Sequence, residues 1–446
     1  MMRRGLLRAA GCAAVLLFCL SAWCAPAQTA PQNGALAQEL THLVCTDPGK
    51  RTRLEEILRA CGLPVVSVAA HEYSPQMLGQ YTRVVTAENA GYGDAVRAGK
   101  PVFCIGPRTG GVEGVDTQAH RDVSLRLRQD GHTQTVFARG EITLIGSTSL
   151  PQTVGTISLQ NGQEAPFAAI GAGVGYAPWY RENDLGAVML ADAFRRWAGL
   201  ADEKGKMYVL FDEIYPFTNL ELLCITAEKF HASGIPFVLR IMPVYDNLDY
   251  PAFQRYAQVL RYAQSLGGSV VLHDPLTVGE AAQYAYDVPK SGQEEIQTRL
   301  QRTKDALEKQ GILRVDMNLP PLRFTVDEIA AMESDGQNFG ALPVDTMICF
   351  SPFQNEAELD EAVERLNALW LPIGRYGEKQ LAGAPKYDET PVDETFEYRQ
   401  EEERTLSGFF KGANKILVLI VALSVVVFIL MLTLGRRLYR RKFYKR

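Results

Sequence analysis

The segment KGKMYVLFDEIYPFTNLELLCITAEKFHASGIPFVLRIMPVY, residues 204–245, and the shorter segment GGSVVLHDP, residues 267–275, decide the fold predicted for this chain. They contain three apolar runs bounded by Gly or Pro, namely Met207–Phe211, Pro236–Val244 and Ser269–Leu272. The residues between these runs have the spacing of amphipathic helices. This order predicts a βαβαβ unit, as in a parallel α/β sheet or barrel.

Titratable side chains stand where two of these strands end. Asp212 and Glu213 follow the first apolar run, and His273 and Asp274 follow the third. Ligands bind at the carboxyl ends of the strands in parallel α/β sheets and barrels, so the two pairs predict a site. The alternative is that the carboxylates begin a solvated loop and that His273 is an ordinary turn residue.

Four short segments follow one another in the same half of the chain. They are Asp212–Pro216 (DEIYP), Gly234–Phe237 (GIPF), Ile241–Tyr245 (IMPVY) and Gly267–His273 (GGSVVLH). In this order they resemble the polysaccharide deacetylase-like (NodB-like) superfamily, specifically its membrane-anchored branch, which is catalogued as a domain of unknown function.

The resemblance implies both a fold and a reaction. The fold is a deformed (β/α) barrel of the glycoside hydrolase/deacetylase type over residues 201–385. The reaction is metal-dependent deacetylation of a polysaccharide, in which Glu213 and His273 hold zinc, cobalt or nickel and Asp212 is the general base that activates water. Arg323 is implied as a further residue of the catalytic site.

The sequence departs from the family pattern at the metal ligands. Active members hold the metal with one carboxylate and two histidines, the second about four residues after the first, and here Thr277 stands at that position. No histidine follows His273, so the late histidine that acts as general acid is absent from the sequence as well. Asp274 is the remaining candidate ligand. A catalytic zinc site requires three protein ligands, so Glu213 and His273 alone are one short.

Three functions are therefore open. In the first, which the missing ligands favour, the metal site is degenerate and the strand ends form a groove that binds a cell-surface glycan or a partner in polysaccharide metabolism. That groove would be lined by Tyr215, Phe217, Tyr245 and Asp246. In the second, the chain is an active carbohydrate esterase, and in the third it is a structural subunit of an envelope assembly.

The N-terminal half is predicted to hold two further regions. Residues 28–118 alternate short strands with helical segments, which indicates a flavodoxin-like α/β region. Residues 119–200 show two-residue alternation interrupted by glycines, which is typical of antiparallel β structure. The Gly-rich loop Gly106–Gly111 could cradle an anion, but it matches neither a P-loop nor a dinucleotide fingerprint, which favours a connecting turn.

The two ends of the chain predict export and membrane anchoring. Residues 1–27 have the basic, apolar and small-residue order of a signal peptide, and residues 386–414 form an acidic stalk. Residues 415–435 contain the uncharged apolar run Ile416–Leu434, long enough to span a bilayer, and residues 436–446 are basic. The prediction is a single-pass membrane protein with its N-terminal ectodomain outside and its tail in the cytoplasm.

Composition excludes one class of partner. A formal charge of −5 over 446 residues gives no basic footprint for nucleic acid. Five cysteines remain after the predicted signal, an odd number without CxxC spacing, so we expect buried thiols and not a disulfide framework.

Overall fold

The computed structural model describes residues 40–200, 204–242, 251–273, 293–317, 320–336 and 338–378, together with Leu417, Val421 and Ser424. The chain divides into two compact units. The N-terminal unit comprises residues 1–129 and 135–202, and the C-terminal unit comprises residues 130–134 and 203–446. Each unit has its own sheet, and the two are described separately.

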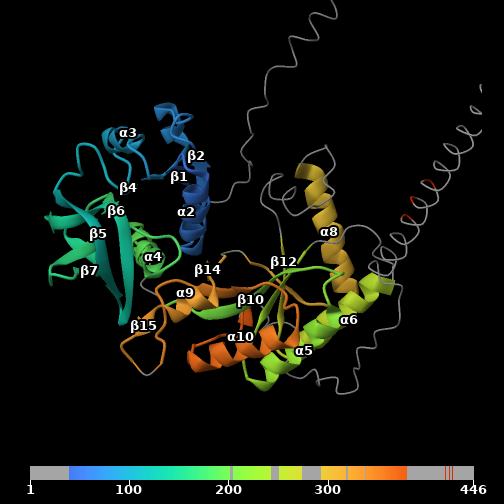
Figure 1. Ribbon diagram of the computed structural model, residues 1–446. Coiled ribbons are helices and arrows are strands. Elements are labelled where there is room, and N and C mark those ends of the chain that lie inside the picture. Colours follow the sequence, from blue (N-terminus) through green and yellow to red (C-terminus); the bar gives the residue numbers. More distant parts are fainter. Residues whose placement is uncertain are drawn as a thin grey trace, which may run out of the picture. The chain divides into compact units, whose positions relative to one another are not determined.

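The first part of the N-terminal unit is a parallel α/β layer (Figure 1). Its strands lie in the order β2-β1-β3-β4-β9, and every neighbouring pair is parallel. This order is typical of doubly wound sheets. The elements are β1 (Thr41–Val44), α2 (Pro48–Ala60), β2 (Val65–Val68), η2 (Pro75–Gln80), β3 (Arg83–Thr86), α3 (Tyr92–Arg97), β4 (Val102–Ile105), β9 (Val174–Ala177) and α4 (Leu185–Trp197).

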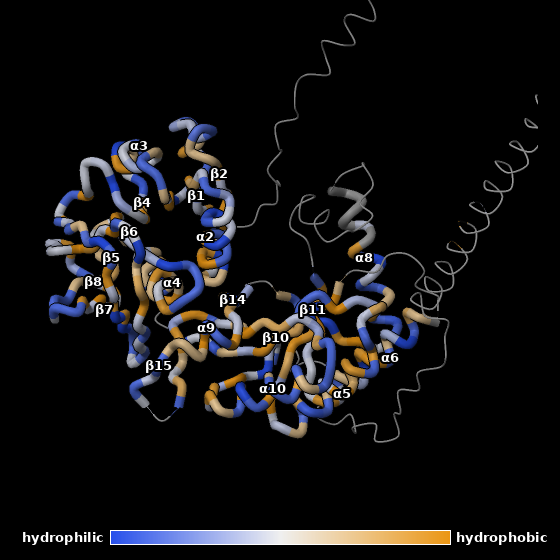
Figure 2. Tube along the Cα trace, viewed as in Figure 1, coloured by the Kyte–Doolittle hydropathy of each residue, from blue (hydrophilic) through white to orange (hydrophobic). Residues whose placement is uncertain are grey.

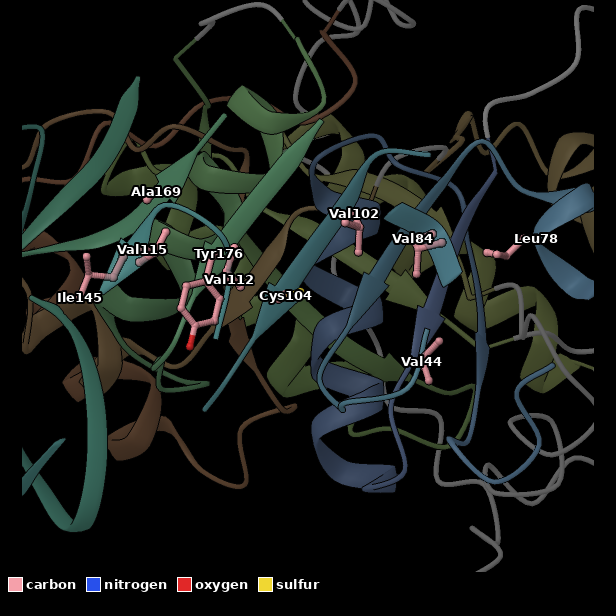
Figure 3. Packing of buried hydrophobic residues seen from close by; sticks show 11 residues of the cluster. Val44, Leu78, Val84, Val102, Cys104, Val112, Val115, Ile145, Ala169 and Tyr176 are labelled. Atoms are coloured by element: carbon pink, nitrogen blue, oxygen red, sulfur yellow. The ribbon is translucent and has the colours of Figure 1, made fainter. Parts of the chain in front are cut away.

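Both faces of this parallel layer are covered. On one face, η2 and α3 contribute Leu78 and Ala95 to a buried cluster with strand residues that include Val84, Cys104 and Tyr176 (Figure 3). On the other face, Phe103 packs edge-on against Phe194 of α4, with ring centroids 4.8 Å apart. A parallel sheet buried on both sides requires apolar residues at successive strand positions, which the VFCI sequence of β4 provides.

Antiparallel strands extend the same sheet. They are β5 (Val115–Gln129), β6 (His132–Thr148), β7 (Gln152–Leu159) and β8 (Glu164–Ile170), in the order β6-β5-β7-β8, and β8 pairs with β9. Residues such as Leu125 and Leu127 of β5 are buried, whereas the alternating residues Arg126 and Arg128 are exposed. The two-residue alternation in the sequence corresponds to this half-buried sheet.

The C-terminal unit contains a second parallel sheet of six strands, ordered β13-β12-β11-β10-β16-β14. Helices α5, α6 and α10 follow β10, β11 and β16 in the chain, and Lys229 of α5 forms an ion pair with Asp360 of α10. Figure 2 shows hydrophobic residues along β10, whose first five residues are all buried. The strands are β10 (Met207–Ile214), β11 (Val238–Ile241), β12 (Ser269–Leu272), β13 (Arg314–Val315), β14 (Leu322–Phe324) and β16 (Thr346–Phe350).

The helices of this unit are α5 (Leu220–Ala232), α6 (Pro251–Ser265), α8 (Gln293–Lys309), α9 (Val326–Ala330) and α10 (Glu356–Ala368). A two-residue strand, β15 (Glu333–Ser334), pairs with His132 and Thr133, which belong to the same unit. Side chains cap several of these helices at the first turn, for example Asn219 at α5, whose Oδ1 accepts from the Leu222 N–H at 3.1 Å.

The predicted fold class is wrong in two respects, and the first concerns the barrel. A closed barrel requires its first and last strands to pair, but among the described residues β13 and β14 stand at the two ends of the six-stranded sheet and do not pair with each other. These strands have only two and three residues, too few for a ladder that closes the sheet. Alternation of strand and helix does not distinguish an open parallel sheet from a closed one.

The second correction concerns the membrane anchor and the localisation derived from it. In the part of the chain that the structure describes, no helix is both long and apolar enough to cross a bilayer. The predicted single-pass membrane protein is therefore contradicted. The predicted signal peptide, stalk and basic tail lie outside the described residues, as does the 415–435 segment apart from Leu417, Val421 and Ser424.

Candidate functional site

One face of the C-terminal sheet changes from apolar to polar as its strands approach their carboxyl ends. Buried residues on this face include Leu210, Val238 and Val271, which belong to one cluster. Two positions further along each strand come Asp212, Arg240 and His273. Because side chains two residues apart lie on the same face of a strand, the three polar groups continue the apolar face to the edge of the sheet.

A β-bulge in β10 places the acidic pair opposite an arginine. Phe211 pairs with Leu239 and Ile214 with Ile241, so three residue steps on β10 face two on β11. The extra residue leaves Asp212 and Glu213 opposite Arg240. Glu213 accordingly has a φ of 55°, in the left-handed region that a residue with a side chain occupies at a cost.

Asp212 is held by its neighbours on both oxygens. The guanidinium of Arg240 donates to it in a two-point contact, through Nε to Oδ1 and through Nη2 to Oδ2. The backbone N–H of Glu213 also donates to Oδ1, at 2.8 Å. Arg323 of β14 reaches along the sheet and brings Nη1 to 3.9 Å from Oδ2. The carboxylate lies in a bidentate ion pair of the kind that fixes orientation.

His273 lies beside this ion pair and is 9% exposed. Its backbone N–H donates to the carbonyl of Ile241 at 2.8 Å, which continues the β11–β12 ladder by one residue. Burial lowers the pKa of His273 to about 4, the charges of Arg240 and Arg323 act in the same direction, and Asp212 opposes them. The imidazole is therefore neutral at physiological pH.

Sequence reasoning missed Arg240. The signal was present, because a single arginine interrupts the apolar run FVLRIM two residues after Val238. A charged residue in a parallel strand that is otherwise buried needs a partner of opposite charge. Asp212, in the preceding strand, supplies that partner.

The described residues do not assemble the implied metal centre. Within the described ranges, no group of three His, Cys, Asp or Glu side chains could hold a metal ion. Glu213 is exposed, and Asp212 is already bound by Arg240. Asp274, the remaining candidate ligand, lies outside the described residues. The arrangement brings together Asp212, His273 and Arg323 of the predicted set, but as an arginine-bound cluster.

Two aromatic residues follow the acidic pair directly. The rings of Tyr215 and Phe217 stack with centroids 4.7 Å apart and an interplanar angle of 20°. The turn that carries them is closed by two hydrogen bonds, from the Thr218 N–H to the Tyr215 carbonyl at 3.0 Å and from the Tyr215 N–H to Thr218 Oγ1 at 2.9 Å. Phe217 is 76% exposed. The other predicted groove residues, Tyr245 and Asp246, lie outside the described residues.

Known proteins offer a limited comparison. No family model matches the chain. A stretch of 106 residues, 22% of the chain, is 30% identical to the uncharacterized protein YdaL of Bacillus subtilis (strain 168). This match spans 18% of the length of that relative.

Carbohydrate deacetylases are among the solved structures that resemble the chain. Agd3, described as a novel carbohydrate deacetylase, is 11% identical with a TM-score of 0.31, covering 66% of this chain and 64% of that one. A family 4 carbohydrate esterase from Bacillus anthracis is 12% identical with a TM-score of 0.25, covering 39% of this chain and 81% of its own. At these values the likeness assigns no activity, so the function is argued from the chain's own residues.

Proposed function

We propose that the carboxyl edge of the C-terminal sheet is a glycan-binding site of deacetylase-like type, without an assembled metal centre. The observation that carries the proposal is the stacked pair of half-buried Tyr215 and exposed Phe217, which lies on a hydrogen-bonded turn next to the exposed carboxylate of Glu213. A pyranose presents an apolar face of C–H groups and a rim of hydroxyl groups. The aromatic rings suit the face, and the carboxylate suits the rim.

The polar cluster supports binding more readily than catalysis. A general base needs a free lone pair within reach of the proton that it removes. Three of the roughly four lone-pair sites of the Asp212 carboxylate already accept, from Arg240 and from the Glu213 N–H. The ion pair between Asp212 and Arg240 instead has a structural role, because it fixes the bulge that presents Glu213 and the adjoining turn.

Binding to glycan polymers tests the proposal. The purified chain is titrated with oligomers of N-acetylglucosamine and, separately, with a neutral glucan, and affinity is compared between wild type and Phe217→Ala. We expect about a fivefold loss of affinity or more, since a stacked ring at a sugar face contributes on the order of 1 kcal/mol or more. Trp370→Ala is the matched control, because Trp370 is also an exposed aromatic residue, at 71%. It follows α10 and precedes Ile373, which forms a β-bridge with Met207 at the opposite end of β10.

Equal affinity of Phe217→Ala and wild type would contradict the proposal, and so would equal losses in both variants. Absence of binding to any glycan would favour the structural-subunit alternative.

An active carbohydrate esterase is the second candidate. It is favoured by the neutral, buried imidazole of His273 at the same edge as two carboxylates, since neutral imidazole is the form that binds metals. Stoichiometric zinc, cobalt or nickel in the purified protein, lost in both Glu213→Ala and His273→Ala, together with acetate release from the N-acetylated oligomer, would establish this activity. Acetate release without bound metal, or bound metal without acetate release, would contradict this metal-dependent activity.

A further inference from the structure

Arg108, in the N-terminal unit, is a buried cation that the proposed function does not use. The side chain is half-buried overall, but its Nε and Nη1 atoms each expose less than 1 Å² and have no hydrogen-bond partner among the described residues. Its Cζ lies 3.7 Å from the centroid of the Tyr92 ring. The aromatic ring therefore holds the guanidinium in place. It does not accept hydrogen bonds from these N–H groups, which lie in the plane of the guanidinium.

The position of Arg108 in the sheet is one where ligands bind. It follows β4, and the intervening Gly106 N–H still donates to the carbonyl of Ala177, the last residue of β9, at 2.9 Å. Arg108 thus follows the carboxyl end of β4 in a doubly wound parallel sheet, beside β9, whose Tyr176 pairs in register with Cys104. Open α/β sheets place their ligands outside the carboxyl ends of the strands.

The loop that carries Arg108 is hydrogen-bonded to its neighbours at Thr109 and has free space at its glycines. Thr109 exchanges two hydrogen bonds with Asn89, which follows β3, at 3.1 and 3.3 Å. Gly106, Gly110 and Gly111 have φ values of 85°, 83° and 68°, and a Cβ at any of them would meet no atom within 4 Å. The loop is therefore held beside the end of β3, while its three left-handed glycines face open space.

The chemistry of Arg108 indicates the ligand. Two buried N–H groups without acceptors are unfavourable, and cation–π attraction to Tyr92 offsets only part of that cost. A planar guanidinium matches a carboxylate in a two-point contact. Arg108 carries a single positive charge, so a second negative charge on the ligand would have no counter-charge from this side chain. A singly charged oxyanion fits better than a doubly charged one.

We propose that Arg108 binds a carboxylate-bearing ligand at the carboxyl edge of β4, beneath the loop Gly106–Gly111. The loop moves aside for the carboxylate to reach Nε and Nη1, and the three left-handed glycines permit that movement. This site belongs to the N-terminal unit and is independent of the glycan site proposed for the C-terminal unit.

Titration of the full chain with simple anions tests the assignment. Binding of glucuronate, acetate and inorganic phosphate is measured calorimetrically and by thermal shift at constant ionic strength, with chloride as the reference anion. We expect saturable binding of both carboxylates, at least tenfold weaker in Arg108→Lys, because lysine lacks the planar fork. Arg97→Lys is the matched control, since Arg97 is a 77% exposed arginine on α3 that pairs with Asp94.

Three outcomes would overturn the proposal. The first is the absence of saturable carboxylate binding to the wild-type chain, which does not depend on any variant folding. The second is tighter binding of phosphate than of either carboxylate, which would assign the loop to a phosphate group. The third is equal carboxylate affinity in Arg108→Lys and wild type. If Arg108→Lys does not fold, Tyr92→Leu replaces it, with the same expected loss because the ring positions the guanidinium.

Discussion

At the scale of single residues, Asp212 and Arg240 form the interaction on which the candidate site depends. Their side chains are 18% and 14% exposed, so water screens the pair only partly. Neither residue is compatible with the apolar face of the sheet without the other. Arg323, 38% exposed, approaches the same carboxylate from the other side of β10.

Removing either partner of this pair destabilises the C-terminal unit. Asp212→Asn leaves the guanidinium of Arg240 without its counter-charge, and Arg240→Gln does the converse, so we expect each to lower the free energy of unfolding by about 2 kcal/mol. The double variant should lose less than the sum of the two. Urea unfolding measures all three.

Lys206→Gln, which breaks an exposed pair with Glu378, is the control and should change stability by about 0.5 kcal/mol or less. Additive effects of the two substitutions would show that the pair contributes no coupling.

The backbone at Glu213 gives a second residue-scale prediction. Both Glu213→Gly and Glu213→Ala remove the carboxylate, but only glycine adopts a φ of 55° without steric cost. We expect the free energy of unfolding of Glu213→Gly, measured in urea, to exceed that of Glu213→Ala by about 1 kcal/mol. Both variants should bind glycan more weakly than wild type. The order of the two stabilities is the critical result. A reversed order would mean that position 213 is not held in the left-handed conformation.

At the scale of elements, close packing between β4 and β9 fixes the parallel layer of the N-terminal unit. Gly175 of β9 pairs in register with Phe103 of β4. A Cβ on Gly175 would lie 2.2 Å from Cδ2 of Phe103, whose ring packs edge-on against Phe194 and Trp197. Glycine is thus required here by the neighbouring ring, because it leaves the space that the ring occupies.

Gly175→Ala therefore tests the packing of the element. The added methyl group forces the fully buried Phe103 ring from its position, so we expect a loss of about 1–3 kcal/mol in the stability of the N-terminal unit. Gly79→Ala is the control, because a Cβ at Gly79 in η2 would meet no atom within 4 Å. Chemical denaturation followed by near-ultraviolet circular dichroism reports on the aromatic cluster. If Gly175→Ala and Gly79→Ala are equally stable, the contact does not constrain the sheet.

At the scale of the whole molecule, each unit contains a buried histidine whose pKa is lowered by burial. His42 of β1 is 1% exposed and stacks on Tyr81 with ring centroids 4.2 Å apart, and burial lowers its pKa to about 4. His273 has its pKa lowered to about 4 in the C-terminal unit. The two units therefore share the same sensitivity to acid through different residues.

Both units should lose stability as the pH falls from 6.5 to 4. A histidine with an unfolded-state pKa near 6.5 and a folded-state pKa of about 4 binds a proton first in the unfolded state, so its contribution is complete above pH 6.5 and disappears on acidification. The loss is up to about 3 kcal/mol for each histidine. Unfolding measured at pH 7 and pH 4.5 should show a smaller decrease for the N-terminal unit of His42→Phe.

His71→Gln is the control for that experiment, because the side chain of His71 is 74% exposed. It should show the same decrease as wild type. An unchanged pH dependence in His42→Phe would exclude His42 as the source of the acid sensitivity.

The sequence by itself determined the local structure of this protein. The predicted strand Ser269–Leu272 is confirmed with those bounds, and the predicted run Met207–Phe211 forms the first five residues of β10, all of them buried. These elements are specified by apolar periodicity and by flanking glycine and proline, which act between neighbours in the chain. The same local signals placed Asp212 and His273 at strand ends.

Only the tertiary structure decided what those strand ends do. Whether a strand–helix alternation gives an open sheet or a barrel depends on which strands pair, and the described strands form an open sheet. Residues far apart in the sequence decided the state of the site, since Arg240 and Arg323 bind or approach a carboxylate that the sequence presented as a free base. Pairing across strands is a long-range interaction, so the pattern of apolar and polar residues within one strand cannot specify it.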